Sequence, residues 1–366
     1  MIKTQANRLE WIDSLRGLAA LGVVFLHLFN KSRHLYPQES FFKLGGIPGL
    51  LVNDFFNLGK IGVVVFFFVS GYVIPYSLNN RTLGEFAMTR FFRLYPAYWL
   101  SIILSVILIG VPSLLVVVTN VTMFQKFVGV ADLNVGYWTL QIELIFYMIC
   151  AVLHYKGLLY HNRTITLGFY LFLVAGLLLA VVRYVTGLKL PVAVPLALDV
   201  MFLGLMFRKL SNKDDVFTSS KILKYVVIFA AALLPICFLA YNKDYGYDEK
   251  WYKYFSSYIL AIVFFVLFFK FKWNNKLFSF MGAISYSLYL LHPVVGFGGM
   301  KYVRNMFPSI SSFNYILLFM AFSVVSAILS YYLIEKPSVR LGKLFIKSKK
   351  KPAQPITVAT AVVTEN

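Results

Sequence analysis

The sequence predicts an all-α, polytopic integral membrane helix bundle, and two observations support this fold class. The first is composition: 59% of the 366 residues are hydrophobic, 14% are charged, and the mean hydropathy is +0.73, whereas about a quarter of an average soluble domain is charged. The second is that apolar runs of roughly 17 to 25 residues, long enough to cross a bilayer, recur along the chain. Because lipid offers the backbone no hydrogen-bond partners, these runs are expected to be helices.

About ten membrane-spanning helices are expected, each centred on one apolar run. The fourth and sixth are the least regular, because the fourth contains Glu143 and the sixth contains Pro195 and Asp199. The ten predicted spans cover residues 11–29, 58–77, 97–118, 137–153, 165–183, 190–207, 224–240, 254–269, 277–297 and 313–334.

The distribution of basic residues predicts the orientation of these spans. With ten spans both termini share one side, and most of the 35 lysines and arginines fall on that side, so both termini are predicted to be cytoplasmic. Residues 1–342 are expected to form the membrane domain. Residues 343–366 begin basic and then lose helical periodicity, which predicts a disordered cytoplasmic tail held near anionic lipid headgroups.

The membrane setting also accounts for the formal net charge of +20. Loop lysines and arginines meet membrane lipids, so no nucleic-acid partner is expected. Cys150 and Cys237 both lie in apolar runs, which argues against a disulfide framework. No metal site and no permanently bound cofactor are expected, and the sequence gives no sign of the oligomeric state.

The first span, "DSLRGLAALGVVFLHLF", carries three ionisable residues in an otherwise apolar segment. Eleven residues separate Arg16 from His27, so on a helix the two differ by only about 20° around the axis and lie about 16 Å apart along it. Asp13 precedes Arg16 by three residues, a spacing suited to an ion pair. Such groups usually face a protein interior or a wet cavity. The alternative is that Arg16 reaches the headgroups and His27 bonds a neighbouring carbonyl.

Polar residues on other spans are expected to lie at matching depths. Glu143 in the fourth span and His292 in the ninth both fall in the outer half of the membrane. We therefore expect His27, Glu143 and His292 to converge in one layer. Glu143 would orient the imidazole of His27 or stabilise its cationic form, as the acid does in a serine-protease triad.

On the cytoplasmic side, "MTRFFRLYPAYW" places Arg90 and Arg93 one helical turn apart, just before the third span. Together with Arg16 they form a cluster suited to binding phosphates, although paired arginines before a span also follow from the positive-inside rule. In the second span, Ser70 and Tyr72 offer hydroxyls and Gly71 permits a close approach, most commonly a helix contact. Arginines at the cytoplasmic side of the membrane, with a histidine deeper in the membrane, suit a molecule whose phosphates stay in the cytoplasm while a thin arm reaches inward. Coenzyme A is such a molecule.

The sequence resembles the acyltransferase-3 family, integral membrane enzymes that transfer acyl groups, most often acetyl, to carbohydrate hydroxyls. Six stretches carry the resemblance, in family order between Leu9 and about Leu341: "WIDSLRGLAALGVVFLH", "FFFVSGYVI", "RFFRLYPAYW", "YWTLQIELIFY", "SYSLYLLHPVV" and "YYLIEKP". The resemblance implies that His27 is catalytic and that Arg16, Arg90 and Arg93 serve acyl-CoA binding or the pore. Trp138 and Glu335, within the matched stretches, are expected to be supporting residues.

The predicted function is therefore a membrane-bound O-acyltransferase of the bacterial cytoplasmic (inner) membrane. It would move an acyl group, with acetyl as the default, from cytoplasmic acyl-CoA as co-substrate to a hydroxyl of a glycan or lipid-linked sugar, such as an O-antigen sugar in lipopolysaccharide. His27 would act as general base or briefly carry the acyl group. The alternatives are a multi-pass transporter or flippase of a lipid-linked sugar and a scaffold for a separate enzyme. The outer loop, residues 30–60, is a candidate acceptor contact or re-entrant segment.

Overall fold

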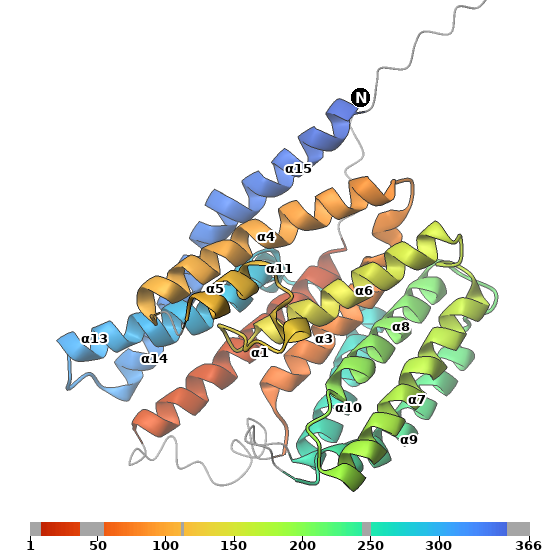
Figure 1. Ribbon diagram of the computed structural model, residues 1–366, viewed down its shortest axis with the longest axis horizontal. Coiled ribbons are helices and arrows are strands. Elements are labelled where there is room, and N and C mark those ends of the chain that lie inside the picture. The colour runs from red at the N-terminus through yellow and green to blue at the C-terminus, as the bar shows by residue number, and fades with distance from the viewer. Residues whose placement is uncertain (1–8, 37–54, 111–112, 244–249, 350–366) are drawn as a thin grey trace, which may run out of the picture.

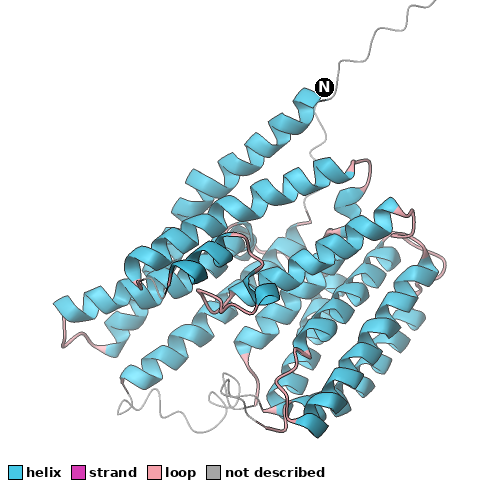
Figure 2. Cartoon of the chain, in the orientation of Figure 1, coloured by secondary structure: helices cyan, strands magenta, loops and turns pink. Residues whose placement is uncertain are grey.

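The computed structural model describes residues 9–36, 55–110, 113–243 and 250–349 (Figure 1). Every regular element in these ranges is a helix (Figure 2). In chain order the elements are α1 (Glu10–Leu35), α3 (Leu58–Val73), η3 (Pro75–Leu78), α4 (Leu83–Leu108), α5 (Leu114–Val121), η4 (Gln125–Val128), α6 (Tyr137–Tyr155), α7 (Asn162–Thr186), α8 (Ala193–Ser211), α9 (Ser219–Ala240), α10 (Trp251–Phe271), α11 (Lys276–Ala283), α12 (Ser285–Leu291), η5 (His292–Gly299), α13 (Met300–Met306), α14 (Ser312–Ser330), η6 (Tyr331–Glu335) and α15 (Lys336–Lys349).

Several helices begin at residues whose side chains satisfy the first free backbone amides. Thr82 and Glu85 form a capping box at the start of α4: the Glu85 amide donates to Thr82 Oγ1 at 3.2 Å, and the Thr82 amide donates to Glu85 Oε2 at 2.9 Å. Asn57 caps α3 through the Lys60 amide. Each cap removes an orphan donor from a helix end, so these polar residues fix where the apolar helices start.

Helix α3 lies at the centre of the molecule, between two groups of helices (Figure 1). On one side it packs against α8 and α10, which with α7 and α9 make a four-helix group. On its other side it packs against α1, which contacts α11, α12 and α14. Helices α4 and α15 pack against each other at the edge of this second group. The central position of α3 matters for function because one of its faces borders the cavity described below.

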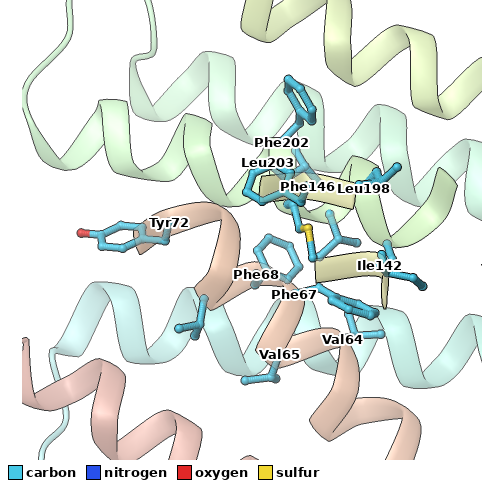
Figure 3. Close-up of a cluster of buried hydrophobic side chains, with 14 of the residues drawn as sticks. Val64, Val65, Phe67, Phe68, Tyr72, Ile142, Phe146, Leu198, Phe202 and Leu203 are labelled. Carbon is cyan, nitrogen blue, oxygen red and sulfur yellow. The ribbon is translucent and has the colours of Figure 1, made fainter. Parts of the chain in front are cut away.

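Helices α3 and α8 cross at two glycines. A Cβ on Gly71 would lie 1.9 Å from the carbonyl oxygen of Met201, and a Cβ on Gly204 would lie 2.3 Å from that of Phe68. This confirms the predicted helix contact at Gly71, because small residues let helix backbones approach closely in membranes. Figure 3 shows the apolar cluster that surrounds the crossing, built from side chains of α3, α6 and α8 that include Phe68, Phe146 and Phe202.

Among the described helices, eight are long and apolar enough to cross a membrane, or nine if the bent pair formed by α11 with residues 285–306 counts as one span. Helix α8, the sixth predicted span, is not one of the eight. It carries Asp199, Arg208 and Lys209, and the residues from Pro195 to Phe207 are all buried inside the protein. A multi-pass membrane protein is thus supported, and the count of ten stays a prediction.

The structure corrects three of the predicted boundaries. The third span begins at Leu83 and ends at Leu108, and residues 114–121 form the separate helix α5, so Arg90 and Arg93 lie inside α4 instead of before it. The ninth span is bent by 60° between α11 and α12. Residues 343–349, predicted to be disordered, continue helix α15, which Phe345 anchors by stacking on Phe92 with ring centroids 5.6 Å apart; residues 350–366 lie outside the described ranges.

Candidate active site

A cavity of about 350 Å³ opens between α1, α3, α4, α6 and α12. Its wall is apolar along α3 and polar where α1, α4 and α6 face one another. The lining residues are Leu9, Ile12, Asp13, Arg16, Val63, Phe66, Phe67, Val69, Ser70, Val73, Ile74, Arg90, Arg93, Leu94, Thr139, Leu140, Glu143, Ser285, Tyr286 and Tyr289.

All three arginines predicted to bind phosphate line this cavity. Arg16 Nη1 lies 3.9 Å from Asp13 Oδ1, which confirms the predicted pairing within α1. Arg90 donates a hydrogen bond from Nη2 to Ser77 Oγ. Its guanidinium group lies over the rings of Phe86 and Tyr147, and each ring centroid is 5.2 Å from Arg90 Cζ. The Nε of Arg90 is buried and has no hydrogen-bond partner among the described residues. A buried, unsatisfied donor beside two further guanidinium groups is suited to an anionic ligand.

Two carboxylates lie near these arginines. Glu143 lines the cavity, accepts a hydrogen bond from Tyr147 Oη at 2.5 Å and accepts a second from Ser70 Oγ at 3.4 Å. Glu335 is buried, accepts a hydrogen bond from Ser287 Oγ at 2.9 Å and attracts Arg93 and Arg16 electrostatically. The two carboxylates balance part of the positive charge of the arginines.

His27 and His292 form a direct pair. Nδ1 of His27 lies 2.8 Å from Nε2 of His292, and the two rings stack with centroids 5.1 Å apart at an interplanar angle of 17°. His292 is buried, and its Nδ1 lies 2.9 Å from the carbonyl oxygen of Leu288. His27 is only partly buried.

The hydrogen-bond chain determines where the protons of two neutral imidazoles lie. The Leu288 carbonyl can only accept, so Nδ1 of His292 carries a proton and Nε2 of His292 is an acceptor. Nδ1 of His27 must then donate to it. Nε2 of His27 is left unprotonated, and it has no hydrogen-bond partner within the described ranges. A lone pair on a partly exposed, oriented imidazole is what a general base requires.

The local sequence explains why His292 points this way. It follows α12 directly and begins the π-helix η5, whose sequence is HPVVGFGG. Pro293 has no amide hydrogen to continue the α-helical pattern, and single-turn π segments often occur at functional sites. With α12 ending here, the His292 ring lies against the last carbonyls of the helix and faces α1.

The predicted convergence of three residues in one layer is only partly correct. His27 and His292 meet, whereas Glu143 bonds Tyr147 and Ser70 at the level of the arginines. The helix register explains the difference: α3 runs antiparallel to α1, and a Cβ on Gly62 would lie 2.7 Å from the Ala19 carbonyl oxygen, which places Ser70 opposite Trp11, about 24 Å from His27 along α1. The imidazole of His27 therefore has His292 as its hydrogen-bond partner, and the role of Glu143 toward His27 stays a prediction.

The remaining predicted supporting residues differ in position. Ser70 and Asp13 line the cavity. Tyr72 is buried on the opposite face of α3, with its ring 5.6 Å from that of Trp11. Trp138 is 36% exposed and does not line the cavity. Most of the outer loop, residues 37–54, lies outside the described residues.

The cavity does not reach His27. Its outer end is lined by Thr139, Phe66 and Tyr289, and the ring centroid of Tyr289 also lies 6.2 Å from that of the His292 imidazole. Sequence reasoning missed Tyr289 and Thr139 as site residues. The available signal was spacing, because Tyr289 precedes His292 by one helical turn and so lies on the same face of α12.

The acyltransferase domain model of the acyltransferase-3 family matches residues 9–335. The chain belongs to the acyltransferase-3 family. No curated protein and no solved structure matches it significantly. The domain match runs through α1, which carries Arg16 and His27, and ends at Glu335 in η6, so the cavity and the histidine pair both lie inside the acyltransferase domain. The family and the apolar helices together make this protein a membrane acyltransferase.

Proposed function

We propose that the protein transfers an acyl group, acetyl by default, from cytoplasmic acyl-CoA to a hydroxyl of a carbohydrate exposed on the other side of the bacterial inner membrane. The carbohydrate is a glycan or lipid-linked sugar, such as an O-antigen sugar. The topology that goes with this function has ten spans and both termini in the cytoplasm. The observation that carries the proposal is the arrangement of an arginine-lined cavity in line with an oriented histidine pair.

The cavity fits the phosphates of acyl-CoA as co-substrate. Arg16, Arg90 and Arg93 present a fixed set of donors, and the buried Nε of Arg90 lacks a partner among the described residues. Guanidinium groups bind phosphates through charge-assisted, often bidentate hydrogen bonds. The apolar wall from Val63 to Val73 on α3, about 15 Å long at the rise of an α-helix, then suits the thin arm that carries the thioester.

The chemistry uses the free nitrogen of the histidine pair. Nε2 of His27 takes the proton of the acceptor hydroxyl as its oxygen attacks the thioester carbonyl. The tetrahedral intermediate collapses by breaking the carbon–sulfur bond, and the departing thiolate takes the proton back from His27, leaving an ester and free CoA thiol. His292 holds the ring in the productive tautomer and shares the positive charge while His27 is protonated.

A labelled-transfer experiment tests the proposal. Membranes that contain the protein and its host's glycans are incubated with acetyl-CoA labelled in the acetyl group, and transfer to glycan and release of thiol are measured together. We expect both with the wild type, and loss of both with His27→Ala. Mass spectrometry of cell-surface glycans from a deletion strain then reports the acyl mass and the modified sugar. Near wild-type transfer by His27→Ala would overturn the proposed mechanism, and translocation of a lipid-linked sugar without thiol release would identify a flippase instead.

A further inference from the structure

Tyr289 separates the two halves of the proposed site. Its ring packs edge-on against Phe66, with centroids 6.1 Å apart, and both residues line the outer end of the cavity. On its far side the same ring contacts His292 at 6.2 Å. An acyl group that moves from the arginines toward His27 must therefore pass the pair of rings formed by Phe66 and Tyr289.

The ring of Tyr289 is held from its hydroxyl end. Tyr289 Oη lies 2.9 Å from Thr139 Oγ1 and 3.2 Å from the carbonyl oxygen of Gly136, while Thr139 Oγ1 donates to the same carbonyl at 2.8 Å. Gly136 also makes room for the ring, because a Cβ there would lie 2.8 Å from Tyr289 Cε1. The start of α6 thus fixes the tilt of a side chain that belongs to α12.

We propose that Tyr289, fixed by Thr139 and Gly136 and packed against Phe66, is the residue that selects the length of the acyl chain. This inference rests on the proposed function. A small acyl group needs only a slight displacement of the ring, whereas a longer chain must push the ring away from Thr139 and Gly136 and break its hydrogen bonds. The ring also separates the cavity from His27, so the thioester meets the base only as the ring gives way.

The test compares acetyl-CoA with butyryl-CoA and hexanoyl-CoA, using thiol release by the purified full-length protein with its glycan acceptor. Tyr289→Ala should raise the ratio of hexanoyl-CoA to acetyl-CoA turnover at least about tenfold, because one or two methylene groups in an apolar pocket are discriminated by about that factor. Tyr289→Phe keeps the ring but frees it, and should raise the ratio by a smaller factor. If Tyr289→Ala is not recovered folded, Tyr289→Phe and Thr139→Val carry the test.

The matched control is Tyr225→Phe. Tyr225 also pairs with a threonine, Thr166, at 3.4 Å, but it lies on α9, away from the cavity, so its removal should leave the chain-length ratio unchanged. Equal losses for all three thioesters in the Tyr289 variants would overturn the inference, because they would show a purely structural role. A wild type that binds or cleaves no acyl-CoA would instead overturn the proposed function, so the two failures are distinguishable.

Discussion

Nδ1 of His27 lies 2.8 Å from Nε2 of His292, whose own Nδ1 is fixed by the Leu288 carbonyl. The two histidines are 265 residues apart in sequence. The two residues therefore have different roles. His27 presents a free lone pair, and His292 accepts the proton of His27 Nδ1, so that this lone pair lies on His27 Nε2. His292 is thus a positioning residue.

Replacing His292 should lower kcat for acyl transfer without weakening donor binding. His292→Ala lets the His27 ring rotate and place its proton on either nitrogen, so we expect kcat to fall by about a hundredfold, a typical contribution of a general base, while KM for acetyl-CoA changes little. His292→Gln offers an acceptor near the position of Nε2 and should restore part of kcat. His161→Ala, an exposed histidine at the start of α7, is the control. A rise in KM with unchanged kcat would contradict the positioning role.

The fold could be predicted largely from the sequence, because lipid leaves the backbone of an apolar run no choice but a helix. The errors occur where local signals compete with hydropathy. The predicted third span began too late, since the helix is set by the capping box at Thr82 and Glu85 and not by the first apolar residue. The bend before α12 and the π turn at His292 depend on packing and on Pro293, which no hydropathy window reports.

The relative positions of site residues on one helix could be predicted from the sequence, whereas contacts between site residues on different helices could be predicted less well. The spacing of Asp13, Arg16 and His27 placed them on one stripe of α1 because helix geometry is fixed. The partner of His27 depended on how α1, α6 and α12 slide past one another. Close contacts such as that of Gly282, just before α12, with the Asp13 carbonyl of α1 set that register, and they are visible only in the folded protein. The hydrogen bonds of Glu143 to Tyr147 and Ser70 could therefore not be predicted.

Removing one guanidinium from the cavity should weaken donor binding. Arg90→Gln deletes the charge above Phe86 and Tyr147 and should raise KM for acetyl-CoA by about tenfold to a hundredfold, since a hydrogen bond to a charged group contributes about 1.5–3 kcal/mol. The effect should shrink at high salt. Arg163→Gln, an exposed arginine on α7 outside the cavity, serves as the control. An unchanged KM for Arg90→Gln would place the phosphates elsewhere.

Replacing Glu143 distinguishes its observed position from the predicted one. If Glu143 balances the arginines, Glu143→Gln raises the positive charge of the cavity and lowers KM for acetyl-CoA by about fivefold, because opposite charges about 4 Å apart attract by about 1 kcal/mol even in water. The turnover number kcat should stay within about twofold of the wild type, a change of less than 1 kcal/mol in the barrier. Initial rates across a range of acetyl-CoA concentrations separate the two parameters. A large fall in kcat at constant KM would instead restore the role of an orienting acid.

Two glycines offer a matched test of the crossing that positions α3. Gly71→Ala places a methyl group 1.9 Å from the Met201 carbonyl oxygen, so α3 and α8 must move apart. We expect a loss of about 1–3 kcal/mol in stability, the usual cost of overpacking, and a lower melting temperature in detergent. Gly84→Ala, on α4, has no atom within 4 Å of the added methyl group and replaces a poor helix former, so its melting temperature should equal or exceed that of the wild type. Equal shifts for the two variants would show that the crossing of α3 and α8 is not a constraint on stability.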